Sequence, residues 1–242
     1  MKPLQLPTML RLLPLLIALG IVFAAAGASD HGFVPIFDGI SLDGWRVVPA
    51  ARQADWSVRD GRIVGSTQGE GSDLIRTGGE LSDFELKLSY RISSPANSGI
   101  HVRGLLGHSK THRVAGYHAD FGHVGIGPSV LGAWDFHGYP RGSNLVNRGQ
   151  IVTISEAGDR TFRDLEDALT PADVSADGWN LVHVTVRGER FSFTINGKTA
   201  SQVIDQESSK RIDRGMIGLQ MHSGEPMRVE FKDIVLKSTE KR

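Results

Sequence analysis

The chain has 242 residues, no cysteine, and a formal net charge of zero from 27 basic and 27 acidic side chains. The lack of cysteine excludes a disulfide framework and a lipid-modified N-terminal cysteine. The balanced charge, without a basic stripe, argues against nucleic-acid binding, which requires a strongly positive face. The composition therefore favours a neutral, soluble partner.

The N-terminus has the pattern of a secretory signal peptide. Lys2 and Arg11 precede an apolar run over residues 12–26. The small residues Ala26 and Ala28 then suit cleavage before Ser29. The run is shorter than the roughly 20 residues of a comfortable membrane span. The sequence therefore predicts a signal peptide over residues 1–28, an exported protein, periplasmic or secreted, with no stable membrane anchor after cleavage, and one mature domain over residues 29–242.

Alternating apolar and polar residues, typical of β-strands, dominate the mature chain. The clearest strands are predicted over residues 84–92, 181–187 and 228–236. Two dipeptides favour two-residue hairpin turns, namely Asp60-Gly61 and Asn196-Gly197.

Helical periodicity is confined to residues 159–169, which end shortly before Pro171 and are predicted as a short helix. Many short strands, 29 glycines and little helix indicate an all-β protein, either a two-sheet antiparallel sandwich or jelly roll, with a closed barrel as the alternative. The segment from Gly104 to Asn147 is rich in glycine, histidine and aromatic residues. It is predicted to form long loops at the rim of a binding site.

Three predicted strands carry chemically capable polar residues two positions apart. Because side chains alternate across a strand, the two members of each pair are expected on one face. If the three strands are neighbours, this face carries a polar patch. Hydrogen-bonded surface groups without a function are the alternative. The pairs are His101 with Arg103, His118 with Asp120, and Gln220 with His222.

Several familiar catalytic motifs do not occur in the sequence. There is no G-x-S-x-G nucleophile elbow, no H-E-x-x-H zinc helix and no G-x-x-x-x-G-K-[ST] phosphate loop. The E-x-D-x-x-E spacing of sandwich-fold glycosidases is also missing, so ordinary hydrolysis by two carboxylates is not expected.

Six segments together resemble the 3-keto-disaccharide hydrolase family, also described as 3-keto-glycoside lyase/hydratase domains. The similarity runs from about Val34 to Lys237. The segments are FDGISLDGW, WSVRDGRIVGS, LSDFELKLSYRISSPANSGIHVR, VAGYHADFG, GWNLVHVTVRGERFSFTINGK and GMIGLQMHSGEPMRVEFKDIVLK.

The resemblance implies a concanavalin A-like two-sheet antiparallel jelly-roll sandwich that acts on small carbohydrates oxidised at C3. A ketone at C3 acidifies the proton on C2, so that a base can remove it and the C1 substituent leaves by β-elimination. Water then adds to the resulting enone. Such a site needs a base, a group that stabilises the enolate oxygen, and a proton source for the leaving oxygen.

Within this scheme His118 is expected to be the base, oriented and made more basic by Asp120. Arg103 is a permanent cation suited to the enolate oxygen, and His222 is expected to be the second acid or base. The remaining candidates bind the substrate: Asn97, His101 and Gln220 through sugar hydroxyls, and Trp134 or Tyr117 by stacking on the sugar ring.

The sequence leaves a divalent metal ion open as a cofactor. His101, His118, Asp120 and His222 are acceptable ligands for a transition ion. Many relatives carry glutamate and glutamine, or glutamine and aspartate, at the two positions held here by His118 and Asp120. A histidine at the first position changes the donor character of the site, which leaves a different substrate, a different catalytic arrangement or loss of activity as alternatives.

Two non-catalytic functions remain open at this stage. The same fold supports lectins, so a carbohydrate-binding domain without activity is the main alternative. A structural domain of a cell-surface assembly is the second.

Overall fold

The computed structural model describes residues 32–138, 141 and 143–239. The predicted signal peptide lies outside these residues, so export and cleavage stay predictions. Among the described residues, no helix has the length and apolar character needed to cross a membrane. Helix is limited there to two short 3-10 turns, Ala50–Asp55 and Pro171–Asp173.

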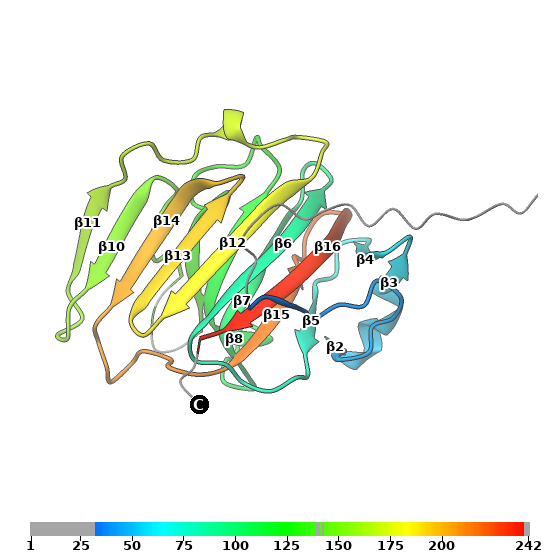
Figure 1. The fold of residues 1–242 in the computed structure, drawn as a ribbon, viewed down its shortest axis with the longest axis horizontal. Helices are drawn as coiled ribbons and strands as arrows, with labels where there is room; N and C mark the ends of the chain where they lie inside the picture. Colours follow the sequence, from blue (N-terminus) through cyan, green and yellow to red (C-terminus); the bar gives the residue numbers. More distant parts are fainter. Residues whose placement is uncertain (1–31, 139–140, 142, 240–242) are drawn as a thin grey trace, which may run out of the picture. The chain divides into compact units, whose positions relative to one another are not determined.

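The strands form two sheets, and β7, β8 and β15 lie behind β12, β6 and β16 in Figure 1. The ten-stranded sheet has the order β11-β10-β14-β13-β12-β6-β16-β4-β3, with β1 paired to β16. Its strands are β1 (Val34–Pro35), β3 (Trp56–Arg59), β4 (Arg62–Thr67), β6 (Phe84–Ile92), β10 (Gln150–Ile154), β11 (Arg160–Asp164), β12 (Asn180–Arg187), β13 (Arg190–Ile195), β14 (Lys198–Asp205) and β16 (Met227–Ser238).

The six-stranded sheet has the order β2-β5-β15-β7-β8-β9. Among the described strands, neighbours pair antiparallel except β10 with β14, which run parallel. The strands of this sheet are β2 (Trp45–Val48), β5 (Ser72–Arg76), β7 (Asn97–Leu106), β8 (Val114–Gly122), β9 (Trp134–His137) and β15 (Met216–Met221).

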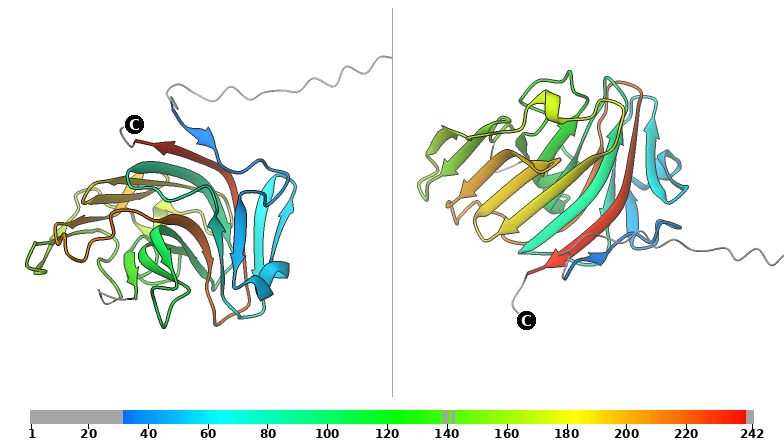
Figure 2. Two further views of the ribbon diagram at one scale, coloured as in Figure 1. Left: turned by 90° about the horizontal axis from the view of Figure 1, so that it is seen from below. Right: turned by 45° about the horizontal axis from the view of Figure 1, so that its top comes forward.

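The core lies between the two sheets, which are seen from two further directions in Figure 2. Every second residue of β6, from Phe84 to Ile92, is buried, as the alternation in sequence predicts. Tyr90 of β6 stacks on Phe121 of β8 with ring centroids 4.2 Å apart, which joins one sheet to the other. The predicted two-sheet jelly-roll sandwich is confirmed.

The clearest predicted strands and both predicted hairpins are present. Residues 84–92, 181–187 and 228–236 fall within β6, β12 and β16. Asn196 and Gly197 join β13 to β14 with φ angles of 50° and 82°. Two successive positive φ angles match the twist of a tight hairpin, and asparagine followed by glycine adopts them at low cost.

The prediction of a helix over residues 159–169 is wrong. Residues 160–164 form β11, which pairs antiparallel with β10 so that Phe162 lies opposite Val152. The apolar residues of this segment share no buried face, because Phe162 is 54% exposed whereas Leu169 is buried. Helical spacing without a common core face does not outweigh pairing with an available strand.

The prediction of long loops from Gly104 to Asn147 is wrong for the middle of that segment. It contains β8 and β9, and all nine residues of β8 are buried. Tyr117, Ala119 and Phe121 alternate along β8 and pack into the core. The glycines that suggested loops leave room for close neighbours instead. Gly116 has a φ of 126° and its Cβ position would lie 3.0 Å from the carbonyl oxygen of Arg103.

Candidate functional site

Four neighbouring strands of the six-stranded sheet present polar side chains on the face turned away from the core. These strands lie in the order β15-β7-β8-β9. Their core-facing residues, such as Ile100, are fully buried, so the residues between them emerge on the opposite face. The structure therefore brings the pair His118 and Asp120 close to the pair Gln220 and His222, although they are about 100 residues apart in sequence.

His118 and Asp120 form a close pair on β8. Nδ1 of His118 lies 2.9 Å from Oδ1 of Asp120. Burial, reinforced by the charge of His101, lowers the pKa of His118 well below its usual range. Burial, reinforced by Asp135, raises the pKa of Asp120 well above its usual range. Both shifts favour uncharged side chains, so the expectation that Asp120 makes His118 more basic is not met.

The carboxylate of Asp73 fixes the His101 ring. Its Nε2 lies 2.8 Å from Oδ1 of Asp73 on β5, and Arg113 donates from Nε to the other oxygen at 2.6 Å. Burial opposes ionisation of Asp73, but His101 and Arg113 more than compensate and lower its pKa. Because an ionised carboxylate can only accept, it holds the proton of His101 on Nε2.

His137 of β9 brings a third imidazole ring to the same place. Its ring centroid lies 4.4 Å from that of His118 and 5.5 Å from that of His101. Its Nε2 lies 3.5 Å from Oδ2 of Asp135. The ring of His112, from the loop between β7 and β8, stacks on His137 at 4.3 Å. We call His101, His118 and His137 the histidine cluster.

A polar cleft of about 410 Å³ opens over the histidine cluster. This volume lies within the range of small-molecule sites. His101, His137 and Asp120 line the cleft, whereas His118 has no exposed surface and lies below it. The other polar groups of the cleft include Asp73, Asn97, Arg113, Asp135, Gln220 and His222.

Four buried side-chain atoms at the polar cleft have no hydrogen-bond partner among the described residues. They are both ring nitrogens of His118, Oδ1 of Asn97 and Oε1 of Gln220. Although Nδ1 of His118 is close to Asp120, the two atoms are not aligned for a hydrogen bond. Buried polar atoms are nearly always satisfied in folded proteins, so this concentration marks a site where a ligand completes the hydrogen bonding or coordination.

Arg103 does not lie on this face, contrary to the expectation from strand alternation. A β-bulge interrupts the β7–β8 pairing between Val102 and Leu105, and Arg103 takes a positive φ of 50° within it. Its guanidinium is buried, donates to the carbonyl oxygens of Ser82 and Ile212, and lies over the Phe191 ring. The bulge re-aims the side chain and gives it a structural role.

Tyr117 and Trp134, expected as stacking residues for a sugar, are fully buried in the core. The Tyr117 ring packs at 4.1 Å from Phe191, and Trp134 lies edge-on to the rings of Phe191 and Phe193. Neither ring reaches the polar cleft, because both side chains share the core-facing positions of paired strands.

Sequence reasoning missed several residues of the site. Asp135 and His137 flank Phe136 on β9 and repeat the spacing of the other polar pairs, so this pattern could have identified them. Asp73 and Arg113 lie 40 positions apart and carry no spacing signal. Their ion pair could only be found from the three-dimensional fold.

Gly99 makes room for the His118 ring. A Cβ at this position would lie 2.2 Å from Cε1 and 2.6 Å from Nε2 of His118. We expect Gly99→Ala to lower the free energy of unfolding by about 1–3 kcal/mol, because a close-packed site resists added volume. Denaturant unfolding measures this loss.

Gly127→Ala is the matched control, since its Cβ position meets no atom closer than the hydroxyl of Ser129 at 4.0 Å. Equal stability of the two variants would show that Gly99 does not restrain the His118 ring.

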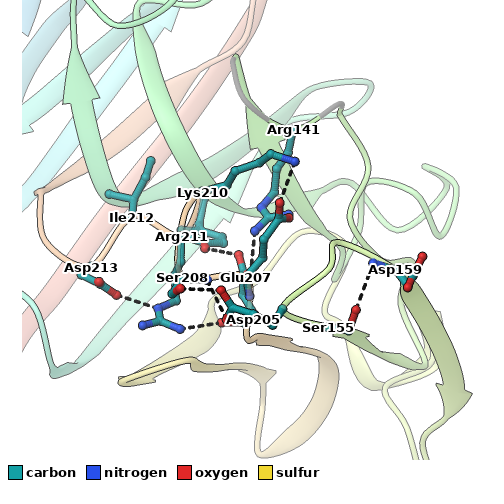
Figure 3. A network of polar contacts seen from close by, with 12 residues as sticks. Arg141, Ser155, Asp159, Asp205, Glu207, Ser208, Lys210, Arg211, Ile212 and Asp213 are labelled. Carbon is teal, nitrogen blue, oxygen red and sulfur yellow. Dashed lines mark hydrogen bonds and ion pairs between the residues drawn. The ribbon is translucent and has the colours of Figure 1, made fainter.

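A buried ion-pair network contacts Tyr117 of β8. Arg141 donates to Asp205 at 2.6 Å and to Glu207 at 2.7 Å (Figure 3). The hydroxyl of Tyr117 donates to Asp205 as well. Arg141 also lines a second hollow of about 720 Å³, which shares Thr111, His112 and Ser143 with the polar cleft. The network therefore anchors the residue next to His118 and borders an extension of the cleft.

Comparisons with known sequences agree with the resemblance described above. The model of a family described as 3-keto-alpha-glucoside-1,2-lyase-like domains matches residues 32–237. A 3-keto-disaccharide hydrolase from Bacteroides thetaiotaomicron is 34% identical over an alignment of 76 residues that covers 28% of this chain. The match spans only 26% of the length of that relative.

Solved structures share the fold at low sequence identity. A candidate glycosyl hydrolase from Parabacteroides distasonis has a TM-score of 0.54 at 18% identity, over 86% of this chain and 94% of its own. A carbohydrate-binding module from Bacillus subtilis has a TM-score of 0.50 at 16% identity, over 81% of this chain and 96% of its own. A Bacillus subtilis protein with a galectin-like fold has a TM-score of 0.51 at 10% identity, over 83% of this chain and 92% of its own.

Proposed function

Because the chain belongs to the family of 3-keto-alpha-glucoside-1,2-lyase-like domains, whose model covers residues 32–237, we propose that it is an enzyme that cleaves 3-keto glycosides. A base takes the proton from C2, the enolate forms, and the C1–O bond breaks as the leaving oxygen takes up a proton. Water then adds across the enone. The observation that carries the proposal is the set of buried, unpartnered polar atoms at the polar cleft.

Asp120 is the group that we assign to proton abstraction. Its side chain reaches the polar cleft, whereas His118 lies below without exposed surface and cannot touch a bound sugar. His118 is therefore a positioning residue, with Nδ1 2.9 Å from the Asp120 carboxyl. A base must come within hydrogen-bond reach of the proton that it removes, which favours Asp120 on geometry. Because burial raises the pKa of the Asp120 carboxyl, only its ionised form can act, and that form is a stronger base than an ordinary carboxylate.

His222 and Arg113 supply the other two functions that the reaction needs. His222 follows β15, is exposed, and lines the same cleft, so it can protonate the leaving oxygen. Arg113 is the guanidinium that lines the cleft, and it takes the place that sequence analysis gave to Arg103 as the cation for an enolate oxygen.

Amide groups and the adjoining hollow account for recognition of the substrate. Asn97 and Gln220 line the polar cleft, and each has one buried side-chain oxygen without a partner, which suits acceptance of hydrogen bonds from sugar hydroxyls. The second hollow adjoins the cleft and has room for the leaving group of a disaccharide.

The test is incubation of the purified protein with 3-keto trehalose or a chromogenic 3-keto glucoside. We expect release of the leaving group, measured by absorbance or chromatography, and no reaction with the same glycoside carrying a hydroxyl at C3. The unoxidised glycoside is the matched control because only the ketone acidifies the C2 proton. Saturable binding without cleavage of the 3-keto sugar would instead support a carbohydrate-binding domain.

A further inference from the structure

Three imidazole rings from three adjacent strands converge at the polar cleft. His101 comes from β7, His118 from β8 and His137 from β9. One ring nitrogen of each residue lies within 4.8 Å of a ring nitrogen of the other two, and all three side chains are buried. His101 and His137 each have a carboxylate beside them, but both ring nitrogens of His118 are unsatisfied, which costs free energy in a buried site.

His101 is prepared for a second partner. Its Nε2 donates to Asp73 at 2.8 Å, and Asp73 is fixed in turn by Arg113 at 2.6 Å. This contact leaves the lone pair of Nδ1 for another ligand. A histidine whose second nitrogen donates to a carboxylate is the arrangement in which metal-binding histidines are usually held.

His118 has no satisfactory partner within the protein. It is fully buried, and neither ring nitrogen makes a hydrogen bond with a described residue. Gly99, which has no side chain, lets the ring lie where a Cβ would meet its Nε2 at 2.6 Å. A ring in this state gains much more from a bound cation than from the neighbouring imidazoles.

We propose that His101, His118 and His137 bind one divalent transition-metal ion, with Zn²⁺ as the reference ion. Three nitrogen ligands suit zinc, cobalt or nickel, whereas magnesium and calcium prefer oxygen. Zinc–nitrogen bonds of about 2.1 Å place ligand nitrogens about 3.4 Å apart in a tetrahedral site. The ligand nitrogens, which lie within 4.8 Å of one another, therefore close in by at most about 1.4 Å on binding.

The polar cleft gives such a site an open coordination position. His101 and His137 line the cleft, so a ligand oxygen entering it can reach the side of the cluster that the protein leaves free. A metal ion at this place polarises a carbonyl or enolate oxygen. This use of the ion rests on the proposed function, whereas binding of the ion does not.

The test uses untagged full-length protein, freed of metal with a chelator and dialysed. Titration with Zn²⁺ followed by calorimetry is expected to give one bound ion per chain with a dissociation constant below about 10 μM, a range accessible to three-ligand sites. Titration with Co²⁺ is expected to give visible absorption bands, whose intensity reports coordination by four or five ligands.

Variants of the ligands separate this site from adventitious binding. We expect His101→Gln and His137→Gln each to weaken Zn²⁺ binding by at least about 100-fold, and Asp73→Asn to weaken it by about 10–100-fold through loss of orientation. His183→Gln, on the ten-stranded sheet, is the matched control and is expected to bind as the wild type does. Circular dichroism verifies that each variant is folded.

The proposal is overturned if wild-type protein takes up no Zn²⁺ at 100 μM, a concentration about ten times the expected limit, or if the two ligand variants bind as tightly as the wild type. The proposed function is tested separately by cleavage. Zinc binding without cleavage of 3-keto glycosides would refute the function and leave the metal site intact. Cleavage by protein that binds no zinc would refute the metal site and leave the function intact.

Discussion

Asp120→Asn is expected to lower kcat for a 3-keto glycoside by about 10²–10⁴-fold, the usual contribution of a positioned general base. Asparagine keeps the shape of the side chain at the polar cleft but cannot take up the C2 proton. Because the variant leaves the hydroxyl-binding amides in place, KM is expected to change little. Steady-state kinetics on the chromogenic 3-keto glucoside measure both parameters.

The matched control for this variant is Asp164→Asn on β11, where the carboxylate is exposed and belongs to the other sheet. It is expected to keep the wild-type kcat. Deuterium at C2 of the substrate provides a second readout, since a slow proton transfer in Asp120→Asn shows a larger isotope effect than the wild type. Unchanged turnover in Asp120→Asn would remove this residue from the assignment of the base.

Arg103→Met is expected to lower the free energy of unfolding by about 3 kcal/mol, because truncating a buried, hydrogen-bonded charge leaves its partners unsatisfied. The carbonyl oxygens of Ser82 and Ile212 lose their donor, and the Phe191 ring loses the cation above it. Denaturant unfolding followed by tryptophan fluorescence measures the loss.

The same variant distinguishes a structural role from the catalytic role expected from sequence. At a temperature where Arg103→Met remains folded, its kcat per folded molecule is expected to lie within about twofold of the wild type, because the guanidinium makes no contact in the polar cleft. Arg187→Met is the control for stability, since its exposed ion pair with Glu85 contributes little. If kcat per folded molecule of Arg103→Met falls by much more than twofold, Arg103 has a catalytic role.

Strand alternation predicted the main features of the fold and much of the site. It predicted which face of β6 and β12 packs into the core. It also predicted that His118, Asp120 and Gln220 lie on the face of their own sheet that is turned away from the core. This reasoning succeeds because a strand has a side-chain period of two wherever its pairing is regular.

The same reasoning failed at Arg103, where the pairing is irregular. A bulge at a left-handed residue is usually suggested by glycine, and arginine gives no such signal. The prediction that Tyr117 and Trp134 stack on a sugar was wrong for another reason. Aromatic residues that bind sugars and aromatic residues of the core occur in similar sequence contexts, and only the packing of the two sheets shows that these two belong to the core.

The polar contacts of the site were not predictable from spacing. Asp73 reaches His101 and Arg113 from a strand that is not adjacent to either in sequence, and His112 joins His137 through a loop conformation. Such contacts depend on the order of strands in the sheet, which sequence periodicity does not determine.

The exposed strand β11 has a consequence for how molecules of this protein meet. It borders the ten-stranded sheet and leaves a row of backbone amides and carbonyls that could template pairing with a second copy. Three charged side chains stand on this border, at Arg160, Arg163 and Asp164, and all are exposed. A second copy that paired here would have to remove water from these charges, so a strand that adds nothing to the interior disfavours growth of the sheet from one molecule into the next.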